Sequence, residues 1–321
     1  MHFKEICYLC GVTILITRMR FFIITASLML VSLLGNSQTV YHSIEKVGTA
    51  YTDWALTETD GKYGFIHQDG YEILAPKYAK IFPFNESRIN WAQVKLDGKY
   101  GFINIECQEV VKPQYDSIYK FNQFHREWAL IEKDHEFGFI TVDAKVVVAP
   151  QYDKVFAFGS IKKDWALVMK DGLYGVIDTT GMEIVSPEYT NIDKFGVIKS
   201  NWAQVEVDGK IGFIPYTGIE VIEPKYDEVF KFNELHKDWA LVKLNNLYGF
   251  IDNRGNEVIE PKYTKIGNFD ELHEGWALIE YQGMYGFISN NGTVVVQPKY
   301  NQIVNDDGIK ALNGDQWVSL K

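Results

Sequence analysis

Residues 239–269 read WALVKLNNLYGFIDNRGNEVIEPKYTKIGNF, and this stretch decides the fold. Its apolar residues alternate or come in blocks of four to six, which is typical of β-strands rather than of helices. Pro261 has no N–H group to donate to a strand ladder, so it indicates a strand end or a sheet edge. The stretch therefore predicts a meander of three or four short strands.

The same pattern recurs every 37 residues along nearly the whole chain. A Gly follows each repeat Trp by ten residues, and a Pro-x-Tyr triplet begins twelve residues after that Gly. Seven copies without any change in length predict a repeat protein whose neighbouring units bury one another. The repeat tryptophans are Trp54, Trp91, Trp128, Trp165, Trp202, Trp239 and Trp276.

Two turn signals divide each copy into strands. Asp-Gly occupies the first turn in four copies, and this pair favours the two-residue hairpin with positive φ at its centre. Gly occupies the second turn in five copies, whereas Cys107 and Ala144 replace it in the other two.

Both faces of the expected strands are apolar. In the first strand of a copy, Trp and Leu point one way while Ala and Val point the other, so neither face carries the polar groups of a solvated surface. Large residues on one face and small residues on the other let adjacent sheets interlock. We therefore predict an all-β fold of seven 37-residue β-meander repeats stacked as propeller-like blades. The alternative is an open β-solenoid or superhelical stack with capping half-repeats.

The two ends of the repeat region keep both arrangements open. Residues 41–48 resemble a last strand without a repeat before it, and residues 300–304 supply another. Residues 316–320 resemble a further first strand, although Trp317 is four residues out of register. Surplus strands at both ends favour caps on an open stack, whereas seven is a common number of propeller blades.

Residues 1–37 are predicted to be a signal peptide. Phe21–Leu34 is an uncharged run of 14 residues, shorter than the ~20 that a membrane span needs, and Arg20 provides the positive flank. Gly35 and Ser37 offer a cleavage site before Gln38.

If translation begins at Met19, residues 1–18 are a mis-assigned start. The alternative to cleavage is an uncleaved membrane anchor over residues 12–34. Cleavage would leave residues 38–321 as one repeat domain without a membrane span. The protein would then be periplasmic, at the cell surface or extracellular.

Charge and cysteine content narrow the possible functions. A net charge of −10 argues against nucleic acid as a partner, because such binding depends on neutralising phosphates with Lys and Arg. Three cysteines exclude a disulfide-rich scaffold, and Cys107 is the one that follows the expected leader. No phosphate loop, nucleophile elbow or metal motif occurs, and Cys107 has no base near it in the sequence. We therefore expect no catalytic residue, no metal and no cofactor.

One register position does suggest a binding surface. The residues three positions before each repeat Trp should line one edge of the stack, and six of the seven can carry positive charge. We predict an anion-binding edge whose affinity rises as its histidines protonate; the alternative is a solvated loop whose cations relieve acidic surroundings. The candidate residues are Tyr51, Arg88, His125, Lys162, Lys199, His236 and His273.

The recurring Tyr-Gly-Phe-Ile, the Asp-Gly before it and the segment VIEPKYD at residues 221–227 resemble the WG-containing repeat, also called the KWG repeat. The resemblance extends over residues 41 to about 305. The chain departs from the family's Trp before the repeat Gly, because five copies have Tyr there. The resemblance implies a bacterial repeat protein, frequently exported, without a shared enzymatic activity.

The function expected from these features is an exported, non-enzymatic β-repeat scaffold that binds a protein or an extracellular polymer. Two alternatives remain. The first is a carbohydrate-binding surface that uses aromatic residues outside the core, such as Tyr41, Tyr119 and Tyr281. The second is a hydrolase with a site in a propeller channel.

Overall fold

The computed structural model describes residues 5–9, 12–16, 41–46 and 52–320. Its contacts divide the chain into two compact units, Met1–Asp116 and Ser117–Lys321. The expectation of a single domain over residues 38–321 stays a prediction. The apolar run expected to be the signal region, Phe21–Leu34, lies outside the described residues. Within the described part, no helix is long and apolar enough to cross a membrane.

In the first unit, the described residues form one hairpin and two four-stranded sheets. The hairpin is β1 (Glu5–Leu9) with β2 (Val12–Ile16). The first sheet consists of β3 (Ser43–Lys46), β4 (Trp54–Thr59), β5 (Lys62–His67) and β6 (Glu72–Tyr78). The second consists of β7 (Lys80–Ile81), β8 (Trp91–Leu96), β9 (Lys99–Asn104) and β10 (Glu109–Tyr115).

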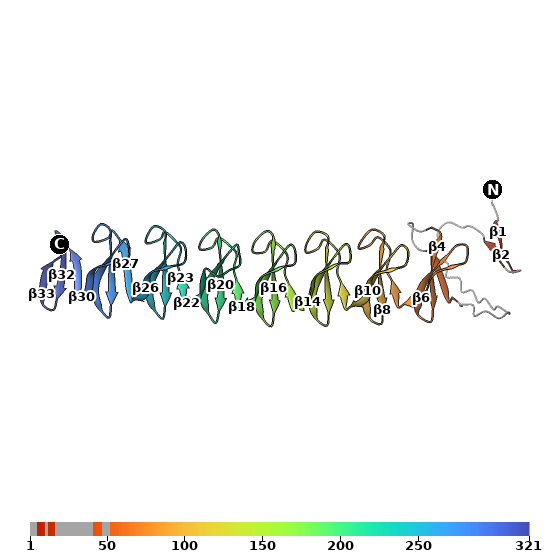
Figure 1. The fold of residues 1–321 in the computed structure, drawn as a ribbon, viewed down its shortest axis with the longest axis horizontal. Helices are drawn as coiled ribbons and strands as arrows, with labels where there is room; N and C mark the ends of the chain where they lie inside the picture. Colours follow the sequence, from red (N-terminus) through yellow and green to blue (C-terminus); the bar gives the residue numbers. More distant parts are fainter. Residues whose placement is uncertain (1–4, 10–11, 17–40, 47–51, 321) are drawn as a thin grey trace. The chain divides into compact units, whose positions relative to one another are not determined.

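In the second unit, the described residues form five four-stranded sheets and one of three strands (Figure 1). The first two sheets are β11 (Ser117–Ile118), β12 (Trp128–Lys133), β13 (Glu136–Thr141) and β14 (Val146–Tyr152), then β15 (Lys154–Val155), β16 (Trp165–Lys170), β17 (Leu173–Asp178) and β18 (Glu183–Tyr189). The next two are β19 (Asn191–Ile192), β20 (Trp202–Val207), β21 (Lys210–Pro215) and β22 (Ile222–Tyr226), then β23 (Glu228–Val229), β24 (Trp239–Leu244), β25 (Leu247–Asp252) and β26 (Glu257–Tyr263). The last two are β27 (Lys265–Phe269), β28 (Trp276–Tyr281), β29 (Met284–Ser289) and β30 (Val294–Tyr300), then β31 (Gln302–Asn305), β32 (Ile309–Asn313) and β33 (Gln316–Ser319).

Every four-stranded sheet is an antiparallel meander in chain order, which confirms the predicted strands. In the sheet β15–β18, the hairpin of β16 and β17 pairs Trp165 with Asp178 and Lys170 with Leu173. The short strand β15 comes from the end of the preceding repeat and pairs with β16. Each sheet is therefore completed by residues of two successive sequence repeats.

A close approach between the repeat Gly and the third strand shapes every four-stranded sheet. The register between β21 and β22 shifts after Ile211, and the backbone around Pro224 crosses directly over Gly212. A Cβ atom on Gly212 would lie 2.5 Å from the carbonyl oxygen of Ile222 and 2.6 Å from the nitrogen of Pro224. Because both atoms belong to the backbone, they have no rotamer that would make room. Only Gly fits at this position.

The repeat Pro lies inside the third strand rather than at its end. Pro261, for example, is followed within β26 by Lys262 and Tyr263. That strand is the outer strand of its sheet, so the missing N–H group of Pro261 costs no ladder bond. The prediction of a sheet edge is confirmed, and the strand continues because the bulge opposite the Gly accommodates the ring.

Successive sheets within each unit pack a face of large side chains against a face of small ones. Trp128, Phe139 and Tyr152 of one sheet meet Ala166, Val168 and Ile177 of the next. The small residues are fully buried, at 0% exposure, so both faces of these sheets are in the core. The predicted interlocking of blades is confirmed, and the fold is an all-β stack of propeller-like blades.

A hydrogen bond from a buried Tyr to a Glu 31 residues later links neighbouring sheets. Tyr189 Oη donates to Glu220 Oε1 at 2.8 Å, and Tyr226 Oη donates to Glu257 Oε1 at 2.8 Å. Burial, together with the neighbouring carboxylate, raises the pKa of both phenols. Val146 and Val294 stand at the Glu position for Tyr115 and Tyr263, where burial alone raises the pKa.

The two ends match the sequence analysis in part. Strand β3 pairs with β4 as the expected last strand of a partial repeat, and β31 does the same with β32. The expected first strand around Trp317 is wrong, because Ile309–Asn313 takes that place and β33 pairs with it as the second strand. Trp317 is out of register because it lies in the second strand of this sheet, whereas the repeat Trp residues lie in the first.

We expect Gly212→Ala to lower the free energy of unfolding by about 3 kcal/mol, because the new methyl group must displace backbone atoms. Gly267→Ala is the matched control, since its Cβ would meet no atom closer than 3.6 Å. Urea unfolding followed by circular dichroism measures both. Equal losses for the two variants would contradict this account of the repeat Gly.

Removing the hydroxyl of Tyr189 should cost about 1.5–3 kcal/mol, because the bond to Glu220 involves a charged acceptor. Tyr263→Phe removes the same atom opposite Val294, and its loss should stay below about 0.5 kcal/mol. Thermal unfolding of the two variants compares them. A loss for Tyr263→Phe as large as for Tyr189→Phe would show that the carboxylate contributes nothing.

Candidate functional site: the loop end of the sheets

The second turn of a sheet lies beside the loop that leads into its Trp strand. In the sheet β11–β14, Val142 N donates to Glu127 O at 2.9 Å and ties the turn to the loop. In the sheet β27–β30, Asn290 N donates to Gly275 O at 2.8 Å in the same way. We call this end of each sheet the loop end, and the opposite end, with the first turn, the hairpin end.

The loops themselves are built by residues with positive φ. Asn122 and Asn233 have φ of 65° and 66°, and the side chain of each accepts a backbone N–H bond from the residue five positions later. Gly159 and Gly196 replace the Asn in the two loops between them. The loop thus turns the side chain three residues before the Trp back over the indole ring.

Each described residue of the predicted anion-binding row covers the Trp of its own repeat. The Lys199 ammonium lies 4.1 Å from the Trp202 ring centroid, and the Lys162 ammonium lies 4.6 Å from that of Trp165. The ring of His273 is stacked on Trp276, with centroids 3.8 Å apart. The other members make the same contact: Arg88 with Trp91, His125 with Trp128, and His236 with Trp239.

Several of these side chains also reach the next sheet. His125 lies 5.0 Å from Phe158, and His236 lies 4.9 Å from Phe269, both measured between ring centroids. Lys199 Nζ donates to the carbonyl oxygen of Asn253 in the following sheet. Burial holds the pKa of Lys199 below its ordinary value, although Asp252 opposes this shift.

These contacts assign most of the row a packing role. His125, Lys162, Lys199 and His236 are half-buried, and Nδ1 of both histidines is buried away from any ligand. Tyr51 lies outside the described residues. The side chains of this row are already engaged with aromatic rings. Anion binding by the row stays a prediction.

The next position along the loop, two residues before the Trp, provides cations that do not cover an aromatic ring, although Arg126 Nε lies 3.8 Å from Oε1 of Glu127. Arg126, Lys163 and Lys237 are exposed there, at the loop end of three sheets in the second unit. We call these three residues the exposed cation set. The sequence analysis missed them because Thr52, Ile89, Ser200 and Glu274 interrupt the pattern at this position.

The aromatic residues that a carbohydrate surface would need do not gather. Tyr119 is 38% exposed and begins a loop at the loop end, whereas Tyr281 is 40% exposed and ends β28 at the hairpin end. In the other unit, Tyr41 donates its hydroxyl to Glu72 at 3.0 Å. No two of these residues are brought together within one unit.

Two features that a hydrolase could use, a metal centre and a reactive thiol, find no support in the described part of the chain. No three His, Cys, Asp or Glu side chains there are close enough to hold a metal ion. Burial, and to a lesser degree Glu106, raises the pKa of the Cys107 thiol to about 11, which opposes formation of a thiolate nucleophile.

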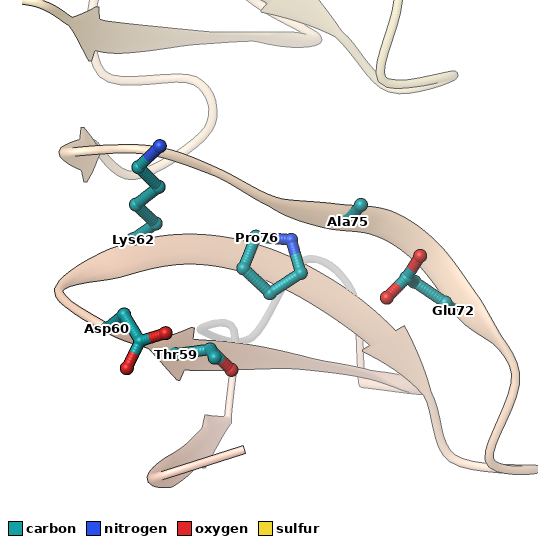
Figure 2. Close-up of a pocket in the computed structure, with 6 residues that line it drawn as sticks. All are labelled: Thr59, Asp60, Lys62, Glu72, Ala75 and Pro76. Atoms are coloured by element: carbon teal, nitrogen blue, oxygen red, sulfur yellow. The ribbon is translucent and has the colours of Figure 1, made fainter. Parts of the chain in front are cut away.

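The described residues also form two surface depressions. One, of about 370 Å³, is lined by Thr59, Asp60, Lys62, Glu72, Ala75 and Pro76. In the view of Figure 2, Pro76 stands between the ammonium of Lys62 and the carboxylate of Glu72, so these charges are held apart. The other, of about 390 Å³, lies beside β33 and includes Lys310, which is paired with Asp306 at 2.7 Å.

A model of the WG containing repeat matches the chain seven times in succession. The matched residues are 63–100, 100–134, 137–174, 174–210, 211–248, 248–284 and 285–308. No curated protein gives a significant sequence match.

Solved structures show distant likenesses. PorZ, an essential surface component of the type-IX secretion system of Porphyromonas gingivalis, is 10% identical with a TM-score of 0.23; the match covers 86% of this chain and 44% of PorZ. Hsv2 of Kluyveromyces marxianus is 11% identical with a TM-score of 0.21, over 84% of this chain and 96% of Hsv2. Apo AztD of Citrobacter koseri is 11% identical with a TM-score of 0.23, over 80% of this chain and 83% of AztD. None of these likenesses carries an argument about function.

Because His236 packs on Trp239 and Phe269, His236→Ala should lower the free energy of unfolding by about 1 kcal/mol. His135→Asn is the control, since the His135 side chain is 100% exposed and Asn tolerates its φ of 69°, and its effect should stay within about 0.5 kcal/mol. Thermal unfolding at neutral pH measures both. An unchanged stability for His236→Ala would contradict the packing role and favour a solvated loop.

Proposed function

We propose that this chain, which belongs to the WG containing repeat family, is an exported, non-enzymatic scaffold that binds an acidic protein or polymer through the loop end of its sheets. The observation that carries the proposal is the exposed cation set, Arg126, Lys163 and Lys237, at matching loop positions of a chain whose net charge is −10. Cations at matching places on several sheets offer an extended partner many similar contacts.

The packing of the loop end supports this proposal. The residues that precede the exposed cation set, His125, Lys162 and His236, are held on Trp rings, and both histidines also contact a Phe of the next sheet. The loops that carry the cations are therefore fixed in place. A fixed surface loses little conformational freedom when it binds a partner. Export and the absence of enzymatic activity belong to the proposal and are inferred from the sequence.

Poly-L-glutamate is the probe that tests the binding surface. Isothermal titration calorimetry of the full chain at low salt should show binding that weakens as salt is added, because the contacts are electrostatic. The triple variant Arg126→Ala, Lys163→Ala, Lys237→Ala should lose at least tenfold in affinity.

The matched control is Lys154→Ala, Lys170→Ala, Lys265→Ala. These three lysines are exposed at the hairpin end, so the control removes the same number of positive charges from the opposite end of the sheets. The control should bind like the unchanged chain. An equal loss in both triple variants would mean that total charge alone governs binding, and the proposal would fail.

A further inference from the structure

Four exposed apolar residues lie at the loop end of two neighbouring sheets in the second unit. Met182 is 62% exposed, Val197 53%, Tyr216 49% and Ile219 74%. Met182 follows the second turn of the sheet β15–β18, and the other three belong to the loop and second turn of the sheet β19–β22. We call these four residues the apolar patch.

Within the sheet β19–β22, the loop and the turn are in contact. The ring centroids of Tyr216 and Phe195 are 4.6 Å apart, and Phe195 precedes Val197 in the loop by two residues. Tyr216 Oη donates to the carbonyl oxygen of Ser200 at 3.1 Å, which ties the turn to the other side of the same loop.

The same turn also packs on the neighbouring sheet. A Cβ on Gly218 would lie 2.7 Å from Cγ2 of Ile184, so the turn rests directly on that side chain. Met182 is two residues before Ile184 and lies on the same side of an extended chain. Met182 and Ile219 therefore lie close in the sequence to the two residues of one contact between the sheets, Ile184 and Gly218.

The other copies of the repeat show that the fold does not require apolar residues at these places. The position of Val197 is polar in every other copy, namely Thr49, Glu86, Gln123, Ser160, Glu234 and Glu271. The shared position of Met182 and Ile219 is otherwise Gln108, Lys145, Asn256 or Thr293, with Tyr71 as the exception. The position of Tyr216 is apolar in two other copies, at Ile105 and Val142. Because the same backbone is built elsewhere with polar side chains, the apolar residues Met182, Val197 and Ile219 need a reason other than folding.

Lysines and carboxylates both surround the apolar patch, but most of the carboxylates are already hydrogen-bonded. Glu183 accepts from Tyr152 and Glu220 accepts from Tyr189, whereas Asp164 is exposed beside Lys163. Lys162 Nζ lies 5.5 Å from the ring centroid of Tyr216, and Lys163 and Lys194 are exposed on the two loops. The carboxylate of Asp178 is compensated by donors within its own turn, from Thr180 and from Met182 N. Asp193 accepts a hydrogen bond from Asn191 at 3.1 Å.

We propose that the apolar patch binds an extended, acidic segment of a partner protein. Apolar side chains of that segment would cover Tyr216 and Ile219, and its carboxylates would meet Lys163 and Lys194. Contiguous exposed apolar surface with a polar rim is typical of interaction sites, and Met182 provides an adaptable contact. This inference rests on the proposed function and deepens it, because it names the surface and the chemistry of the segment.

A random library of displayed 12-residue peptides, selected on the immobilised full chain at physiological salt, tests the proposal. Enriched peptides should combine Asp or Glu with apolar residues. They should lose at least tenfold in affinity for the variant Met182→Thr, Val197→Gln, Ile219→Asn, which leaves Tyr216 and the net charge unchanged. Each substituted residue occurs at the same repeat position in another copy, so the variant should retain its unfolding temperature.

The matched control is Asn253→Thr, Asn256→Thr, which exchanges uncharged polar residues in the second turn of the next sheet. The control should bind the selected peptides like the unchanged chain. Peptides that bind the apolar-patch variant equally well, or no enrichment at all, would overturn the inference. Self-association of the full chain that the variant abolishes, measured by light scattering, would make a second copy the occupant and also overturn it.

The apolar-patch variant keeps all three residues of the exposed cation set, so it should bind poly-L-glutamate like the unchanged chain. Loss of peptide binding with retained poly-L-glutamate binding supports both proposals. Retained peptide binding by the variant refutes the apolar patch while the proposed function stands. A failure of the unchanged chain to bind poly-L-glutamate refutes the proposed function independently of the peptides.

Discussion

The close approach of the third strand to the repeat Gly is the constraint on which this architecture depends. The strand crosses within 2.6 Å of the place where a Cβ would stand on every repeat Gly, and it leaves its regular register there. The bulge brings the Pro to the outer edge and directs the following Tyr into the core, where Tyr226, for example, is 0% exposed. That Tyr then reaches the Glu of the next sheet. Gly, Pro and Tyr thus recur together every 37 residues, and in the copies that carry the Glu its carboxylate adds a hydrogen bond to the next sheet.

Much of this could be predicted from the sequence because the fold repeats itself. The alternation of Trp and Leu with Ala and Val predicted sheets with two buried faces, and Ala166 and Val168 at 0% exposure confirm this. The surplus strands at the ends were also predicted. The strand assignment near Trp317 failed because the segment Ile309–Asn313, which forms the first strand there, carries no Trp to signal it.

The candidate site was harder to predict, because its geometry depends on loop conformation. Spacing alone placed Lys199 and His236 on one edge, but it could not show that Asn233 and Gly196 turn these loops back over the Trp rings. For the same reason, exposed Lys163 was overlooked beside half-buried Lys162. The apolar patch escaped notice because its residues come from two repeats, and only the contacts of Tyr216 and Gly218 join them.

The offset between sequence repeat and sheet has an evolutionary consequence. Since the short strand of one repeat completes the sheet of the next, a gain or loss of 37 residues, wherever it begins in the repeat, leaves whole sheets on both sides. Such an array can lengthen or shorten by recombination between its own copies without leaving an incomplete sheet at the junction. Selection can then diversify loops one sheet at a time, as Val197 and Ile219 illustrate, while the scaffold beneath them stays constant.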